Sequence, residues 1–185
     1  MVIVLISGKA EHGKDTFAVF LKEALEEKGY KVGIYHFAKA VKEEAAEKLG
    51  WDGSKDEQGR SLLQKHGQGM REYDPYYWCK KLEEKLTGDE DIILCPDTRY
   101  KTEVGYFKIR LDSNYTVVTL RVNRYQNSRP YDNNLTVEQR NHISETDLDD
   151  FHFDIRVKYD EGVENVRSMA HSTAGFVMPV KTVKG

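Results

Sequence analysis

Val2–Thr16, VIVLISGKAEHGKDT, is the stretch of sequence that decides the fold. Its first part, Val2–Ile6, is a short apolar and β-branched run, which is typical of a buried parallel strand. Two glycines five residues apart follow, then a lysine, and then a segment with apolar residues at helical spacing. A strand, the pattern Gly-x-x-x-x-Gly-Lys and a helix, in this order, predict a phosphate-binding loop. The alternative is a glycine-rich turn that only caps a helix.

We expect this phosphate loop, Gly8–Thr16, to hold the phosphates of ATP. Gly8 and Gly13 let the backbone turn tightly and bring its N–H groups near an anion. The helix that follows adds the positive end of its dipole, and Lys14 adds a point charge for the terminal phosphates. The predicted nucleotide-binding residues are Gly8, Lys9, Ala10, Glu11, His12, Gly13, Lys14, Asp15 and Thr16.

One residue of the loop departs from the strict pattern, because Asp15 stands where Ser or Thr usually follows the lysine. A carboxylate there repels phosphate unless a cation lies between them or the side chain points away. Either Asp15 helps to hold Mg²⁺ through water, or Thr16 supplies the hydroxyl. Asp97, at the end of a later apolar run, is the third predicted magnesium ligand, with capping of the next helix as the alternative.

Apolar runs alternate with helical patterns along the rest of the chain. We expect further strands at residues 31–37, 91–97, 115–122 and 153–159, the last at an edge, and helices at 14–28, 38–49, 60–66, 76–86, 103–109 and 161–170. Gly67–Gly69 should break a helix, and the tail from His171 should be weakly ordered. This alternation predicts one α/β domain over residues 1–185, a three-layer αβα fold with a five-stranded, mainly parallel sheet of the P-loop NTPase type.

Composition and charge limit the kinds of binding partner that the sequence predicts. The 185 residues carry a formal net charge of −3, which predicts neither a nucleic-acid face nor a polybasic membrane patch. Cys79 and Cys95 lack the spacing of a metal site or a redox motif. The apolar run at Val2–Ile6 is too short for a signal sequence or a membrane span, so we expect a soluble, cytoplasmic protein.

Charged residues follow three of the predicted strands. The carboxyl ends of parallel strands meet at one edge of a sheet, so these residues should lie together. Arg99 can fork onto a phosphate or a carboxylate, or pair with Asp97 or Glu103. The predicted catalytic residues are Lys14, Arg99, Arg121 and Arg124.

Two long segments between the strands are predicted to complete the site. Residues 123–150 are too many for an idle connection; they contain arginines and then an acidic run, and we expect a lid-like flap rather than a solvated excursion. The segment of about 38–88 is expected to be helical and to bind the acceptor, although ordinary helix packing is as good an explanation for its aromatic rings. The predicted substrate-binding residues are Arg60, Gln64, Arg71, Trp78 and Arg99.

Several of these stretches together resemble the deoxynucleoside monophosphate kinases of bacteriophages. They are ISGKAEHGKDT at 6–16, FAKAVKEEAAEKLGW at 37–51, Gly59–Gln64, Asp97–Arg99 with Glu103, and HISETDLDD at 142–150. The phosphate loop is also similar to that of phosphomevalonate kinases, which share Gly-Lys-Asp. Other nucleoside monophosphate kinases, whose loops end in Gly-Lys-Gly-Thr, place their threonine at Thr16.

The resemblance implies transfer of the γ-phosphate of ATP to a deoxynucleoside 5′-monophosphate, with Mg²⁺. Arg99 would face the acceptor phosphate, and Gln64, Arg71 and Trp78 would line the acceptor pocket. The resemblance also allows a homodimer. For a phage-encoded chain it implies a location in the host cytoplasm. Two other functions stay open: a kinase of another small phosphorylated acceptor, such as phosphomevalonate or dephospho-coenzyme A, and an ATP-binding regulatory module that is not a kinase.

Overall fold

The computed structural model describes residues 1–54, 56–109 and 115–179. The chain divides into two compact units. The first, here the sheet unit, consists of Met1–Ile34 and Gly88–Gly185. The second, here the helical unit, is Tyr35–Thr87, which nearly coincides with the segment that the sequence predicts to be helical. Among the described residues, no helix is both long and apolar enough to cross a membrane.

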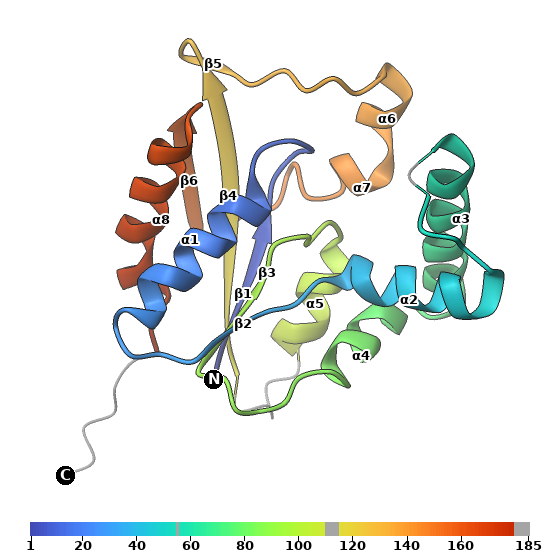
Figure 1. The fold of residues 1–185 in the computed structure, drawn as a ribbon, viewed down its shortest axis with the longest axis horizontal. Coiled ribbons are helices and arrows are strands. Elements are labelled where there is room, and N and C mark those ends of the chain that lie inside the picture. The colour runs from blue at the N-terminus through green and yellow to red at the C-terminus, as the bar shows by residue number, and fades with distance from the viewer. Residues whose placement is uncertain (55, 110–114, 180–185) are drawn as a thin grey trace. The chain divides into compact units, whose positions relative to one another are not determined.

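The sheet unit is built on five parallel strands in the order β2-β3-β1-β4-β6 (Figure 1). All of β1 is buried, which explains its continuous apolar sequence. A two-residue strand, β5, pairs antiparallel with the far end of β4. The strands are β1 (Val2–Ser7), β2 (Val32–Ile34), β3 (Ile92–Cys95), β4 (Thr116–Gln126), β5 (Arg129–Pro130) and β6 (Ile155–Asp160).

Helices cover both faces of this sheet. Helices α1 (Lys14–Glu26) and α8 (Val163–Val177) pack on one face, in a core that includes Val4, Ile6 and Phe17. The alternate residues of β1 point to the other face, on which α5 (Lys101–Ile109) lies (Figure 1). The predicted α/β class, with its mainly parallel five-stranded sheet between helical layers, is confirmed.

Two short helices lie between β5 and β6, α6 (Val137–Asn141) and α7 (Ile143–Thr146). Helix α6 begins with a capping box, in which Thr136 and Gln139 each accept a main-chain N–H of the other. His142 caps α7, because its ring nitrogen accepts the N–H of Ser144 at 3.2 Å. Residues 123–150, predicted as a lid-like flap without assigned secondary structure, therefore contain the end of a strand, a hairpin and two capped helical turns.

The helical unit contains α2 (Phe37–Leu49), α3 (Glu57–Tyr73) and α4 (Tyr77–Glu83). Its small core is made by Ala40, Val41 and Trp78. Helix α3 begins earlier than predicted because the Asp56 carboxylate accepts the N–H of Gly59 at 2.7 Å and caps the helix. Asp74 is the C-cap of α3, and Tyr76 is the N-cap of α4.

The predicted helix break at Gly67–Gly69 is wrong, because α3 continues through all three residues. The carbonyl oxygen of Gly67 accepts hydrogen bonds from Trp78 Nε1 at 3.0 Å and Arg71 Nη1 at 3.1 Å. A Cβ at position 67 would lie only 3.3 Å from that guanidinium nitrogen. The glycine therefore leaves space for the side chain of Arg71 and does not interrupt the helix.

The prediction of a weakly ordered tail from His171 is also wrong, because α8 extends to Val177. Thr173, Ala174 and Val177 are buried, and the last two belong to the core beside α1. Strand β4 is longer than predicted and β2 is shorter, since α2 already begins at Phe37. Residues 110–114 and 180–185 lie outside the described residues.

Candidate active site at the carboxyl end of the sheet

The loop between β1 and α1 depends on two glycines for its shape. A Cβ on Gly8 would lie 2.6 Å from the main-chain oxygen of Val122 on β4. Gly13 has φ of 71°, in the left-handed region, and a Cβ there would lie 2.7 Å from the hydroxyl oxygen of Tyr159. Any side chain at either position would strain the loop, so both glycines are required by its close approach to neighbouring strands.

Lys14 is the buried cation of the loop. Its Nζ donates to the main-chain oxygen of Lys9 at 2.8 Å. Burial first, and then the positive charge of Arg99, lower the pKa of Lys14 to about 7, while the charge of Glu145 works in the opposite direction. An anion bound beside this amine would stabilise its charged form, which is the behaviour expected of a phosphate-binding lysine.

Arg99 and Arg121 reach the same loop from the neighbouring strands. Arg99 follows β3, and its Nη1 donates to the main-chain oxygen of Gly8 at 3.2 Å. Arg121 lies on β4 in register with Ser7, and its Nη1 donates to the Ser7 hydroxyl at 3.2 Å. Burial is the main cause that lowers the pKa of Arg121. The structure thus brings these two side chains to the phosphate loop, as the strand order predicts.

Arg124 holds the outer part of the loop. Its main-chain N–H donates to Nδ1 of His12 at 3.3 Å, and its Nη1 donates to the main-chain oxygen of Glu11 at 3.3 Å. Its guanidinium carbon lies 3.9 Å from the centroid of the Tyr131 ring, a cation–π contact. Burial, as the largest cause, lowers the pKa of His12, which favours the neutral ring. Arg124 is therefore fixed by contacts that the sequence did not predict.

The hairpin after β4 lays a strap, residues 127–136, along the loop. Asn127 and Ser128, both with positive φ, form its two-residue turn. The Tyr131 hydroxyl donates to the Glu11 carboxylate at 3.3 Å, and Asn133 Nδ2 donates to the main-chain oxygen of Ala10 at 3.4 Å. The available sequence signal for this hairpin was Asn127, because Asn is favoured in the two-residue links of hairpins.

A cavity of about 330 Å³ lies between the strap, the loop and β4. Three cationic side chains reach it, from Lys9, Arg121 and Arg140. Arg140 also organises the strap, because its guanidinium donates to the main-chain oxygens of Asn133 at 2.7 Å and Leu135 at 2.9 Å. Asp132 and Glu145 also line the cavity, so its lining carries both signs of charge, with cations that could bind a phosphate-bearing ligand once their carboxylate partners are displaced.

Two carboxylates of the predicted lid lie against these cations. Glu145 Oε1 lies 2.6 Å from Arg99 Nη1, and Glu145 Oε2 accepts the N–H of Ala10 at 3.0 Å. The Asp149 carboxylate lies 2.6 Å from Lys9 Nζ and 3.1 Å from Arg121 Nη2. The sequence shows these two residues as part of an acidic run but gives no partner for either. Asp149 lies in the turn after α7 and not on the same helix as Glu145, so no local spacing in the sequence indicates this pair of contacts.

The predicted magnesium ligands provide hard oxygen donors. Asp15 and Thr16 are exposed on the first turn of α1, and Asp97 is partly buried in the turn that follows β3. Within residues 1–54, 56–109 and 115–179, no group of three or more His, Cys, Asp or Glu side chains could hold a metal by itself. Such a donor set fits a Mg²⁺ ion that takes most of its ligands from phosphates and water.

The predicted acceptor residues differ in their surroundings within the helical unit. Arg60 and Gln64 are exposed on α3, whereas Arg71 is partly buried against Gly67. Trp78 is only 1% exposed and packs edge-on against the rings of His66 and Tyr77. Trp78 is therefore a core residue, which corrects the prediction that its ring lines the acceptor pocket.

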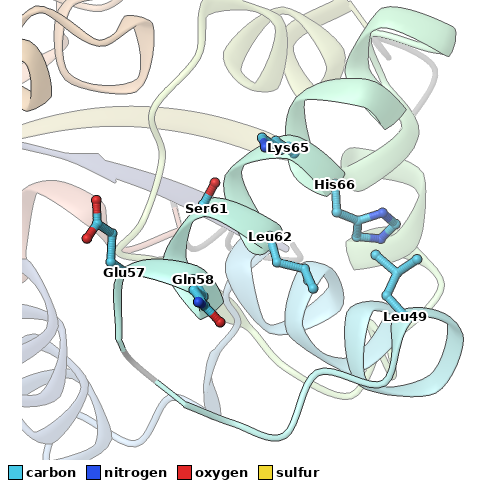
Figure 2. Close-up of a pocket in the computed structure, with 7 residues that line it drawn as sticks. All are labelled: Leu49, Glu57, Gln58, Ser61, Leu62, Lys65 and His66. Carbon is cyan, nitrogen blue, oxygen red and sulfur yellow. The ribbon is translucent and has the colours of Figure 1, made fainter.

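The helical unit has a pocket of its own, of about 750 Å³ (Figure 2). The side chains of Leu49, Leu62 and His66 gather at one end of it, and Ser61 and Lys65 lie along the same helix (Figure 2). Glu57 and Gln58 complete the lining from the first turn of α3. None of the predicted acceptor residues lines this pocket. Arg60 and Gln64 are next to lining residues in the sequence of α3.

Comparison with solved structures finds kinases at low similarity. A gluconokinase from Sinorhizobium meliloti 1021 is 12% identical, covers 95% of this chain and 92% of its own, and has a TM-score of 0.49. A shikimate kinase from Aquifex aeolicus vf5 is 19% identical, with 95% and 98% covered and a TM-score of 0.47. The Mycobacterium tuberculosis APS kinase in complex with AMPPNP and APS is 12% identical, with 94% and 95% covered and a TM-score of 0.48. All three similarities are distant.

A search of curated proteins gives no match. The family model of phosphomevalonate kinase, in contrast, matches residues 6–113. The matched range is more than half of the chain and contains the phosphate loop, the whole helical unit, Asp97 and Arg99. The chain is an ATP-dependent P-loop kinase of a small phosphorylated acceptor, and it belongs to the phosphomevalonate kinase family.

Proposed function

We propose that this protein transfers the γ-phosphate of ATP to the phosphate group of phosphomevalonate. The observation that carries the proposal is the extent of the family match. A phosphate loop alone does not select an acceptor, but the match continues from the loop through residues 35–87, the segment expected to bind the acceptor. It therefore favours a phosphomevalonate acceptor over the deoxynucleoside monophosphate that the resemblance to phage kinases implies.

The donor side of the reaction follows from the loop. In our proposal Lys14 and the main-chain N–H groups of the loop bind the β- and γ-phosphates of ATP. Lys14 is already buried in the free protein, so binding of ATP does not have to close the site around this side chain. The phosphates also restore the charged state of Lys14, whose pKa is lowered to about 7 in the free protein.

Magnesium would be held beside the loop by Thr16 or Asp15 and, through water, by Asp97. When bound, Mg²⁺ would neutralise part of the phosphate charge. The side-chain oxygens named above would hold the ion or its water ligands. Which of the two neighbours, Asp15 or Thr16, serves the metal is tested by Asp15→Ser, because an unchanged Mg²⁺ requirement would assign that role to Thr16.

The guanidinium groups act on the phosphate that moves and on the phosphate that receives it. We assign Arg99 to the acceptor phosphate and Arg121, with Arg124, to the charge that develops on the transferred group. A phosphate monoester loses its second proton with a pKa near 6, so it is already a nucleophile at neutral pH. The reaction then needs orientation and charge stabilisation, and no side-chain base.

The helical unit supplies acceptor selection in this proposal. Arg60 and Arg71 offer cations for the acceptor's phosphate or carboxylate, and Gln64 offers an amide for a hydroxyl or carbonyl group. A small aliphatic acceptor needs no stacking platform, which agrees with the burial of Trp78. The pocket beside Leu62 and His66 gives this unit a partly apolar recess for such an acceptor.

A deoxynucleoside monophosphate remains the second candidate acceptor. The stretch HISETDLDD at 142–150, which supports the resemblance to phage kinases, lies outside the family match. Tyr73 on α3 is 84% exposed and could stack on a base although Trp78 cannot.

The test is a panel of acceptors with ATP and Mg²⁺, in which acceptor-dependent release of ADP is measured. The panel contains phosphomevalonate, dTMP, dGMP and dephospho-coenzyme A. We expect phosphomevalonate to give the highest kcat/KM. Turnover with a deoxynucleotide and none with phosphomevalonate would overturn the proposed acceptor. ATP binding without turnover of any acceptor would instead favour a regulatory module.

A further inference from the structure

The acidic run at the end of the predicted lid has no part in the reaction described above. It follows His142 and contains Glu145, Asp147, Asp149 and Asp150. An acidic segment is unexpected beside a loop that binds phosphate, because like charges repel. In the structure α7 nevertheless lies next to the phosphate loop (Figure 1).

The carboxylate of Glu145 contacts two hydrogen-bond donors of the kind that bind a phosphate. One carboxylate oxygen accepts the N–H of Ala10, in the middle of the loop, at 3.0 Å. The other lies 2.6 Å from Nη1 of Arg99. The side chain is only 10% exposed, so these contacts are largely shielded from water. A carboxylate that receives a main-chain N–H and a guanidinium N–H is bound in the same manner as a phosphate oxygen.

Asp149 repeats the arrangement four residues later, in the turn that follows α7. Its two oxygens lie 2.6 Å from Nζ of Lys9 and 3.1 Å from Nη2 of Arg121. Lys9 also donates to the main-chain oxygen of Glu145 at 2.5 Å. Three cations at the carboxyl end of the sheet are thus paired with one short segment, which is the pattern of an internal counter-anion.

Contacts outside the site hold this segment in place. The N–H of Lys101 donates to the Asp147 carboxylate at 2.6 Å, and Lys101 Nζ lies 2.8 Å from Asp150. Leu148, between the two inward-facing carboxylates, is buried. Alternate acidic residues therefore face opposite partners, the loop on one side and the start of α5 on the other, so the docking is built into the sequence of the segment.

We propose that Glu145 is an internal competitor of ATP, whose carboxylate occupies the phosphate position of the loop until the nucleotide displaces it. The proposal rests on the function proposed above, because it takes the loop as the ATP site. Glu145 and a phosphate of ATP cannot both accept the N–H of Ala10, so binding of ATP must move Glu145 away from the loop, which also breaks its contact with Arg99. The observed affinity for ATP is then reduced by the fraction of molecules in which Glu145 is bound.

The test is the substitution Glu145→Gln, which keeps the size and polarity of the side chain and removes its charge. Binding of ATP, and separately of inorganic pyrophosphate, is measured by calorimetry with no acceptor present. We expect both ligands to bind about tenfold more tightly to Glu145→Gln than to the wild-type protein, because the neutral amide is a weaker partner for Arg99. The matched control is Glu138→Gln on α6, an exposed residue of the same region, which should leave both affinities unchanged.

A second substitution keeps the test decisive if Glu145→Gln unfolds the protein. Asp149→Asn removes the more exposed of the two carboxylates, and we expect about threefold tighter binding. Equal or weaker binding of ATP to the variants, with the wild-type protein binding ATP, would overturn this inference and leave the proposed function intact. A lower kcat with unchanged affinity would also overturn it, because Glu145 would then position Arg99 during catalysis. Failure of every protein to bind ATP would contradict the proposed function itself.

Discussion

The two units hold their candidate residues in different ways. At the end of the sheet Lys14 and Arg121 are buried, and with Arg99 they are hydrogen-bonded to the loop or its flanking strand. In the helical unit Arg60 and Gln64 are exposed on α3, and only Arg71 has a side-chain contact that fixes it there. In our proposal the donor chemistry is therefore preorganised, whereas acceptor selection depends on side chains with fewer fixed contacts.

This difference separates two kinds of mutational effect. Residues at the end of the sheet should affect transfer to every acceptor, because they act on ATP and on the moving phosphate. Residues of the helical unit should affect the KM of one acceptor and leave the KM of ATP unchanged.

The largest expected effect is that of Lys14→Met. We predict that turnover falls by about 1,000-fold or more, because the charge beside the terminal phosphates is lost. Lys22→Met, at a partly buried residue of the same helix that pairs with Glu26, is the control and should keep the wild-type rate. The measurement is steady-state ADP release with thermal melts of all three proteins. A Lys14→Met variant that retains the wild-type rate would show that the loop does not serve the reaction.

Arg121→Lys is expected to have the next effect. A lysine keeps the charge but cannot contact Ser7, Asp149 and a phosphate in the planar geometry of a guanidinium. We predict a decrease in kcat of about 100-fold with little change in the KM of the acceptor. A change confined to the acceptor KM would place Arg121 with the acceptor residues and remove the distinction between the two units.

Arg60→Gln and Arg71→Gln probe the helical unit. We expect each to weaken the apparent affinity for phosphomevalonate, seen as an acceptor KM raised by about tenfold, the value for loss of one charge-assisted hydrogen bond. The KM of ATP should stay unchanged. Lys42→Gln, which removes an exposed charge from α2 of the same unit, is the control. Unchanged acceptor KM in both arginine variants would mean that the acceptor is selected elsewhere.

A further prediction, on stability and not on catalysis, concerns its dependence on pH. The pKa of Lys14 is about 7 in the folded protein and near its ordinary value of 10.5 in the unfolded chain. Between these values only the unfolded chain holds the proton, so a rise in pH stabilises the fold by up to about 1.4 kcal/mol per pH unit from this group.

Denaturant unfolding of the wild-type protein and Lys14→Met from about pH 7 to about pH 9.5, inside the window between the two pKa values, measures this contribution. The free energy of unfolding of the wild-type protein should increase relative to that of the variant as the pH rises, since the other groups are common to both. A difference that stays constant with pH would contradict the burial of Lys14 as the cause.

The sequence was sufficient for the parts of the molecule that depend on local pattern. Val2–Ile6 is apolar because β1 is buried on both faces, and Gly8 and Gly13 are required by close approach, so the strand and the loop could be predicted. Placement of Arg99 and Arg121 at the loop followed from the rule that parallel strands end at one edge.

Long-range pairing decided what could not be predicted. Glu145 and Trp78 carry no local signal for their partners, which lie 135 residues away at Ala10 and 11 residues away at Gly67. The sequence predicts that Gly67 breaks a helix. In the structure its main-chain oxygen instead accepts hydrogen bonds from the side chains of Trp78 and Arg71. The sequence could not select the acceptor for a related reason, since residues shared in a phosphate loop do not encode the shape of an acceptor pocket.

The most direct test of the central claim is to identify the product by ³¹P NMR. The protein is mixed with ATP, Mg²⁺ and phosphomevalonate, and Lys14→Met serves as the inactive reference. We predict loss of the phosphomonoester signal and appearance of a diphosphate product in equal amount to ADP. Formation of ADP with inorganic phosphate alone, or an unchanged phosphomonoester signal in the presence of the wild-type protein, would contradict the claim that this protein phosphorylates phosphomevalonate.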